Sequence, residues 1–295
     1  MWQNLLEEIK LGNTKTLARC ISLIENEYDG YENLLELLPV TATKIVGITG
    51  PPGAGKSTLT EALIAAYVQD NKKVGVICVD PSSPFNMGAL LGDRIRMSDW
   101  YNHPSVFIRS LASRGSVGGL HPKIIEVADI IKAGGFDIVI IETVGVGQSE
   151  IEIAGLADTT VVVLVPEAGD EVQTMKSGLM EIADIFVVNK ADRPGANTFA
   201  NNLKQMLAPG FHQQHHNIPV IKTVASKKEG IDLLKSSIDN QRELKPDDRK
   251  AWLQVEKAFH LIRNKRMKDV VKADLKDAID KEGKLFNLYR FVKNY

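Results

Sequence analysis

The sequence predicts an α/β fold in which a mainly parallel sheet is covered by helices on both faces. Apolar runs rich in β-branched residues alternate with stretches of helical periodicity from about residue 44 to 234, and this alternation is typical of parallel sheets. A glycine-rich turn lies between the first such run and the first helical stretch. With 295 residues, 44% of them hydrophobic and 25% charged, the chain can bury a sizeable core. We expect one large domain with appendages.

Helices are expected ahead of the sheet. Apolar residues between Trp2 and Leu38 recur at helical spacing, and Gly12-Asn13 and Asp29-Gly30 interrupt them. The pattern predicts two or three short helices, which form an N-terminal helical extension over residues 1–42.

Seven short apolar runs are expected to form the strands. They cover residues 45–49, 74–79, 106–108, 138–141, 160–165, 185–188 and 220–223, and they are separated by helical patterns such as residues 59–68. The sheet and its helices are assigned to one domain over residues 43–237.

The last part of the chain, residues 238–295, is polar and helical, with Lys245-Pro246 as a joint. Its apolar side chains recur at intervals of three and four, at Trp252, Val255, Phe259 and Ile262. Such a stripe must pack either against the main domain or against a second subunit.

Residues 50–58, GPPGAGKST, fit the phosphate-loop template G-x-x-x-x-G-K-[ST] between a strand and a helix. Glycines let successive backbone N–H groups curl around phosphate oxygens, at a helix N-terminus that already favours an anion. Lys56 is expected to reach the β- and γ-phosphates, and Ser57 to bind Mg²⁺. The motif predicts a nucleoside triphosphate site; a glycine-rich turn without a ligand is disfavoured, because every template position is filled.

Acidic residues follow the predicted strands, where open α/β sheets bind their ligands. Asp80 follows the second run, and Glu142 follows the fourth, in the position of an acidic Mg²⁺ partner. Asp93 lies between them in Gly92-Asp93-Arg94-Ile95-Arg96. Because Mg²⁺ keeps several waters, some of these groups act through water. Taken singly, Asp80 or Asp93 could equally cap a helix.

Residues 142–150, ETVGVGQSE, have the composition of a nucleotide-dependent switch. Gly145 can bring its N–H to the γ-phosphate, and the glycines permit movement. Gln148 is a candidate for orienting the attacking water, although its offset from Gly145 is unfamiliar. Residues 167–173 form either a second mobile segment or a solvated acidic loop before a helix over 174–182.

Asn189-Lys190-Ala191-Asp192 follows the sixth run and indicates guanine recognition. The Asp192 carboxylate can accept both the ring N–H and the exocyclic amine of guanine, which adenine cannot offer, and such pockets can discriminate by about 10⁴ to 10⁵. Asn189 would tie this loop to the phosphate loop, and the Lys190 stem would cover the base. Ala225-Ser226-Lys227 resembles the second guanine-contact loop. GTP is therefore favoured over ATP.

These residues resemble a known family, the cobalamin-associated G-protein chaperones of methylmalonyl-CoA mutase, or MeaB/ArgK-like proteins, which also carry an older label as LAO/AO transport ATPases or kinases. Glu142 stands where Ras-like GTPases place an aspartate before the switch glycine. The matching segments are GPPGAGKST from Gly50, VDPSSP from Val79, GDRIRM from Gly92, ETVGVGQSE from Glu142 and EIADIFVVNKAD from Glu181.

The resemblance implies a phosphate-loop GTPase that works as a homodimer through its C-terminal helices, with residues 169–173 similar to a third switch that communicates with the mutase. It implies Mg²⁺ held by Ser57, Asp80, Asp93 and Glu142. For hydrolysis we single out Lys56, Glu142, Arg96 and Gln148. The nucleotide would be held by Gly53, Ala54, Gly55, Lys56, Ser57, Thr58, Arg96, Gly145, Asn189, Lys190, Asp192, Ser226 and Lys227.

The mechanism implied is slow hydrolysis of GTP to GDP and phosphate that gates adenosylcobalamin loading and protects or reactivates methylmalonyl-CoA mutase or a related acyl-CoA mutase. The older label leaves an alternative, a kinase or ATPase acting on a lysine-arginine-ornithine transport protein. A nickel metallochaperone is a weaker alternative, because a Cys- or His-rich tract is missing. The arginines to test for charge stabilisation are Arg94, Arg96, Arg109 and Arg114.

Composition argues against several classes of protein. A net charge of −1 argues against nucleic-acid binding through an overall basic field. No apolar stretch approaches the roughly 20 residues that span a bilayer, and the first residues do not resemble a signal or transit peptide. Two cysteines, Cys20 and Cys78, support no disulfide framework. We expect a cytoplasmic protein with neither nucleic acid nor membrane as a partner.

Overall fold

A computed structural model describes residues 1–80, 97–112, 120–143, 152–168, 177–207, 218–244, 247–282 and 286–293. These residues divide into two compact units, Met1–Leu253 and Gln254–Tyr295. The first unit extends beyond residue 237, the predicted end of the sheet domain. The predicted domains over residues 1–42, 43–237 and 238–295 stay predictions.

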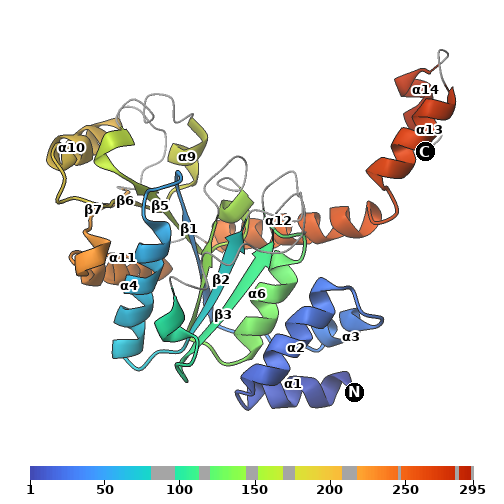
Figure 1. The fold of residues 1–295 in the computed structure, drawn as a ribbon, viewed down its shortest axis with the longest axis horizontal. Coiled ribbons are helices and arrows are strands. Elements are labelled where there is room, and N and C mark those ends of the chain that lie inside the picture. The colour runs from blue at the N-terminus through green and yellow to red at the C-terminus, as the bar shows by residue number, and fades with distance from the viewer. Residues whose placement is uncertain are drawn as a thin grey trace. The chain divides into compact units, whose positions relative to one another are not determined.

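The first unit contains a parallel sheet in which the described strands follow the order β3-β2-β4-β1-β5-β6-β7 (Figure 1). The predicted α/β fold is therefore confirmed. The third strand runs four residues past its predicted end, because the ladder with β2 continues through the polar residues Arg109 and Ser110. The strands are β1 (Lys44–Thr49), β2 (Val74–Asp80), β3 (Val106–Ala112), β4 (Ile138–Glu142), β5 (Thr159–Leu164), β6 (Ile185–Val188) and β7 (Val220–Lys222).

Helices cover both faces of this sheet, because successive side chains of a strand point to opposite faces. On β5, Val161 and Val163 join the core under α4 and α11, whereas Val162 and Leu164 join the core under α9 and α10. Helix α6 lies against β2 and β4. The helices are α4 (Lys56–Gln69), α6 (Ile124–Ala133), α9 (Ser177–Ile182), α10 (Ala196–Met206) and α11 (Ile231–Leu244).

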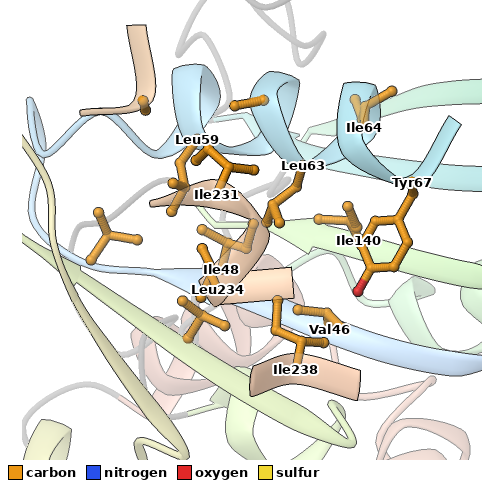
Figure 2. Packing of buried hydrophobic residues seen from close by; sticks show 14 of the residues in the cluster. Val46, Ile48, Leu59, Leu63, Ile64, Tyr67, Ile140, Ile231, Leu234 and Ile238 are labelled. Atoms are coloured by element: carbon orange, nitrogen blue, oxygen red, sulfur yellow. The ribbon is translucent and has the colours of Figure 1, made fainter. Parts of the chain in front are cut away.

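The core under α4 fixes the helix that begins at the glycine-rich turn. Figure 2 shows Leu59 and Leu63 of α4 in the same core cluster as Leu234 of α11, and all three are fully buried. Burial of each such leucine contributes about 1.5–3 kcal/mol. At the far end of α4, the Tyr67 hydroxyl donates to Asp239 Oδ1 over 3.2 Å. Helix α4 is therefore packed against the sheet along its length.

Three helices precede the sheet, as predicted: α1 (Trp2–Lys10), α2 (Thr14–Glu25) and α3 (Tyr31–Glu36). The Asn13 side chain caps α2 by accepting from the backbone N–H groups of Lys15 and Thr16, both over 3.1 Å. Helices α1 and α2 contact α6, and the Arg109 guanidinium of β3 is paired with Glu25 of α2. These contacts make the N-terminal extension part of the first compact unit.

The C-terminal region is helical, with α12 (Asp247–Arg266), α13 (Lys272–Glu282) and α14 (Leu288–Lys293). The side chains of its predicted apolar stripe are exposed to solvent: Trp252 is 64%, Val255 52%, Phe259 60% and Ile262 53% accessible. Within the described ranges, no helix has both the length and the apolar character that crossing a membrane requires.

Candidate nucleotide-binding site

The glycine-rich turn, residues 50–58, joins β1 to α4 with backbone angles that favour glycine. Gly50 has a φ of +136°, and a side chain there would collide with the carbonyl oxygen of Val163. Gly55 has a φ of +88° at the N-cap of α4, and a Cβ would collide with the Asn189 amide. Only glycine fits both positions without strain. The turn therefore places the N-terminus of α4, which attracts anions, at the carboxyl end of β1.

Lys56 lies inside this turn. Its side chain is 7% exposed, and Nζ donates to the carbonyl oxygens of Gly50, over 2.9 Å, and Pro51, over 3.1 Å. Charge-assisted hydrogen bonds of this kind hold the ammonium in place. A phosphate oxygen that entered the turn would compete with these two carbonyls for the same donor.

Glu142, the last residue of β4, is bonded through both carboxylate oxygens. Oε1 accepts from Ser57 Oγ over 2.6 Å, and Oε2 accepts from Thr60 Oγ1 over 2.9 Å. The acid is only 5% exposed. Sequence reasoning singled out Ser57 and Glu142 but missed Thr60. The signal was its spacing of three from Ser57, which puts both hydroxyls on one face of a helix.

Asp80 ends the neighbouring strand and is also buried. In the parallel ladder of β2 and β4, Cys78 is opposite Glu142, so Asp80 lies two residues further along at the same sheet edge. Hydroxyl and carboxylate oxygens are the donors that Mg²⁺ prefers. Over the described ranges, no group of three or more His, Cys, Asp or Glu side chains is placed to hold a metal ion. The described donor set of Ser57, Asp80 and Glu142 fits Mg²⁺ in chemistry.

Several predicted site residues lie outside the described residues, namely Asp93, Arg96, Gly145 and Gln148, together with Arg94 and Arg114. Arg109 is described. Its guanidinium binds Glu25 and also donates to Ser22 Oγ over 3.1 Å. It joins α2 to the edge strand β3.

A pair of buried threonines fixes the chain on either side of the site. The hydroxyls of Thr49 and Thr143 are 2.9 Å apart, and the backbone N–H of Thr143 donates to the carbonyl of Ile48 over 3.0 Å. Thr49 precedes the glycine-rich turn, and Thr143 precedes residues 144–151. Thr143 is the second residue of the segment predicted as a switch, residues 142–150, so the start of that segment is fixed beside the turn.

A pocket lies beside the turn, where the N-terminus of α4 meets the loops that follow β6 and β7. Arg193 and Val224 are lining residues that sequence reasoning missed, because neither belongs to a recognised motif position. The pocket is lined by Gly55, Thr58, Asn189, Lys190, Asp192, Arg193, Val224, Ala225 and Ser226.

Asn189 joins the three chain segments around this pocket. Its Nδ2 donates to the carbonyl oxygen of Ala54 over 2.9 Å. Its Oδ1 accepts from Thr223 Oγ1 over 3.1 Å and from the Ala225 backbone N–H over 3.2 Å. The residue is only 3% exposed. One buried amide thus fixes the pocket's outline, because a buried polar group is costly to leave without its partners.

Charged side chains surround the pocket mouth. Lys190 has a φ of +55°, and its Nζ donates to the carbonyl oxygen of Gly53 over 2.7 Å. Asp192 Oδ2 accepts from Lys227 Nζ over 3.3 Å, and both side chains are about half exposed, so this pair is weak.

Arg193, at the same mouth, bonds to Glu167 over 2.6 Å in a further exposed pair. The hydrogen bond from Arg193 lowers the pKa of the Glu167 carboxyl. Glu167 belongs to the short helical turn Pro166–Ala168 after β5, next to residues 169–173, which lie outside the described ranges. The pair connects the pocket mouth to the start of that acidic segment.

Comparison with known proteins gives consistent results. A family model described as methylmalonyl Co-A mutase-associated GTPase MeaB matches residues 17–279. A putative GTPase of Pyrococcus abyssi is 48% identical over 248 residues, which cover 82% of this chain and 76% of that protein. A fused isobutyryl-CoA mutase of Geobacillus kaustophilus is 35% identical over 237 residues, 75% of this chain and 22% of the fusion. A crystal structure of an LAO/AO transport system kinase has 26% identity and a TM-score of 0.71, and the match covers 96% of this chain and 87% of that one.

Proposed function

The chain belongs to the MeaB family of methylmalonyl-CoA mutase-associated GTPases, and from this premise we propose that it uses GTP hydrolysis to gate adenosylcobalamin loading of a mutase and to protect or reactivate that enzyme. The observation that carries the nucleotide-binding part of the proposal is the clamp made by Asn189. It joins the glycine-rich turn to the loop of the guanine motif, so phosphate and base would be bound by one connected unit.

The phosphates would lie at the N-terminus of α4. Backbone N–H groups of residues 53–58 would face their oxygens, and Lys56 Nζ would exchange its carbonyl partners Gly50 and Pro51 for phosphate oxygens. Arg96 would add a second positive charge. These contacts neutralise the triphosphate and hold the γ-phosphate in a fixed place.

Ser57, Asp80, Asp93 and Glu142 would hold Mg²⁺, some of them through water. When bound, the ion supplies charge neutralisation on the phosphate oxygens. Ser57 and Glu142 already touch. A serine hydroxyl can offer a lone pair to a cation while its O–H continues to donate to the carboxylate, so this contact suits the role.

The guanine base would enter the pocket beside Asn189. Asp192 would accept from the ring N–H and the exocyclic amine, and Lys227, now paired with Asp192, would move aside or pack on the base. Lys190 would cover one face, and the loop containing Ser226 would meet the base oxygen. Selectivity over adenine follows from the donor pattern that Asp192 requires.

Hydrolysis would need a water aligned with the γ-phosphate. The oxygen of that water would form a bond to the γ-phosphorus while the bond from this phosphorus to the bridging oxygen breaks. GDP would leave with the electron pair of that bond, and a proton of the water would pass to the inorganic phosphate. Gln148 would orient the water, Gly145 would contact the γ-phosphate, and Arg96 would stabilise the transition-state charge. Residues 142–150 and 169–173 would then report the nucleotide state to the mutase.

The partner assignment is supported by the family description and by the fused mutase relative. We further infer a homodimer formed through the C-terminal helices, because the exposed stripe that includes Trp252 and Phe259 needs an apolar partner. The protein would act in the cytoplasm, with no nucleic acid or membrane as a partner.

A second candidate is a kinase acting on an amino-acid transport protein, which the name of the similar crystal structure suggests. Incubation with GTP labelled at the γ-phosphate separates the two functions. Faster release of free labelled phosphate when the mutase is added supports the gating function. Label transferred covalently to a partner protein would contradict it and support the kinase.

A further inference from the structure

A buried threonine near the start of α4 holds one oxygen of the acid in the proposed metal site. Thr60 is fully buried. Its Oγ1 donates to Glu142 Oε2 over 2.9 Å and lies 3.0 Å from the carbonyl oxygen of Lys56. The hydroxyl has one proton, and the ionised carboxylate is the stronger acceptor of the two.

Thr60 and Ser57 together determine how Glu142 is oriented. They are three residues apart on α4, so their side chains point from one face of the helix. Ser57 bonds to Oε1 and Thr60 bonds to Oε2. With one hydroxyl on each oxygen, rotation of the carboxylate about its own axis would break one of these bonds. A single hydroxyl would leave that rotation open.

We propose that Thr60 is a positioning residue: its hydroxyl fixes the carboxylate of Glu142 and thereby sets the affinity of the GTP site for Mg²⁺. The inference rests on the metal site of the proposed function. Groups that orient a metal's ligands commonly change metal affinity by about 10–100-fold when they are removed. A purely structural Thr60, which only satisfied the carbonyl of Lys56, would instead alter the phosphate loop whether or not Mg²⁺ is present.

The test compares three variants. Thr60→Val removes the hydroxyl with little change in shape, and Thr60→Ser retains it. The matched control is Thr160→Val in β5, because Thr160 is also fully buried and its hydroxyl has no hydrogen-bond partner among the described residues. Thermal unfolding in EDTA without nucleotide shows that each variant folds, and Thr60→Ala replaces the valine variant if that one does not.

The measurement is the dissociation constant of Mg²⁺ for the protein bound to fluorescent GDP, together with GDP affinity in EDTA. We expect Thr60→Val to weaken Mg²⁺ binding about tenfold and to leave GDP affinity in EDTA within about twofold. Thr60→Ser and Thr160→Val should behave as the wild type. In a Glu142→Gln background, Thr60→Val should not change Mg²⁺ affinity further, because the carboxylate through which Thr60 acts has been removed.

Unchanged Mg²⁺ affinity in Thr60→Val would overturn the inference. An equal loss of GDP affinity with and without Mg²⁺ would also overturn it, because that result marks a structural role. If the GDP affinity of the wild-type protein were the same with and without Mg²⁺, the metal site of the proposed function itself would be overturned. The two failures are therefore distinguishable.

Discussion

The side-chain amide of Asn189 donates to the backbone carbonyl of Ala54 over 2.9 Å, so the loop after β6 and the glycine-rich turn are joined by a buried hydrogen bond. The other end of the same amide accepts from Thr223 and from the backbone of Ala225. One buried side chain therefore holds the three segments together.

We expect Asn189→Ala to lower the free energy of unfolding by about 2 kcal/mol, because a buried carbonyl and two donors lose a partner. GDP affinity should fall by at least about tenfold, because the glycine-rich turn and the loop after β6 are no longer held in their relative positions. Chemical denaturation and calorimetric titration measure the two effects. Asn202→Ala, at an exposed position of α10, is the control, and an Asn189 variant that bound GDP as tightly as this control would refute the clamp.

Asp192→Asn should reduce the preference for GDP over ADP by at least about 100-fold, because two hydrogen bonds from guanine to a charged acceptor are lost. The variant should gain affinity for xanthosine diphosphate, since xanthine carries a carbonyl where guanine carries the amine and the asparagine amide can donate to it. Competition against fluorescent GDP measures both. The exposed Asp232→Asn should change neither; retained guanine preference in Asp192→Asn would show that another group reads the base.

The thiol of Cys20 provides a pH-dependent test of the N-terminal helices. Burial raises the pKa of this thiol to about 11. The folded state therefore holds the proton more tightly than the unfolded state, and stability should fall as the pH rises from about 9 to about 11. The decrease in unfolding free energy across this range should be smaller in Cys20→Ala by up to about 2–3 kcal/mol. Parallel stability curves for the two proteins would contradict the burial of this thiol.

Replacement of an apolar stripe residue should change the oligomeric state. If the C-terminal helices form a homodimer, Phe259→Glu places a charge in the apolar contact and should shift the protein from dimer to monomer. Sedimentation equilibrium measures this. Glu256→Gln, on the same helix, serves as a control that leaves the dimer intact. A Phe259→Glu protein that remained fully dimeric would exclude this surface as the interface.

The features that could be predicted from the sequence are those encoded by neighbouring residues, in apolar runs and short motifs. The buried parallel strands are read as apolar runs because both of their faces are covered, and β3 was underestimated where polar Arg109 and Ser110 interrupt its run. Within the site, Lys56, Ser57, Asn189 and Asp192 were selected because each occupies a fixed motif position, and their roles in binding stay predictions.

Residues that act through contacts between distant segments were missed. Thr60 meets Glu142 across 82 positions of sequence, and Arg193 meets Glu167 across 26. Their residue types are common on helix surfaces and in loops. The spacing of three places the Thr60 hydroxyl on the same helix face as Ser57, but a single sequence does not show that this face meets Glu142. The exposure of the α12 stripe also depends on where the rest of the chain packs, which periodicity alone does not determine.

The most direct test of the proposed function is the rate at which adenosylcobalamin is loaded onto an apo acyl-CoA mutase, followed by the cofactor's absorbance, with this protein bound to GTP, to GDP or to a non-hydrolysable GTP analogue. We expect the loading rate to differ between the GTP-bound and the GDP-bound protein. With the non-hydrolysable analogue, the loading rate should stay at the value for the GTP-bound protein. The same loading rate with all three nucleotides, and without this protein, would contradict the proposed gating.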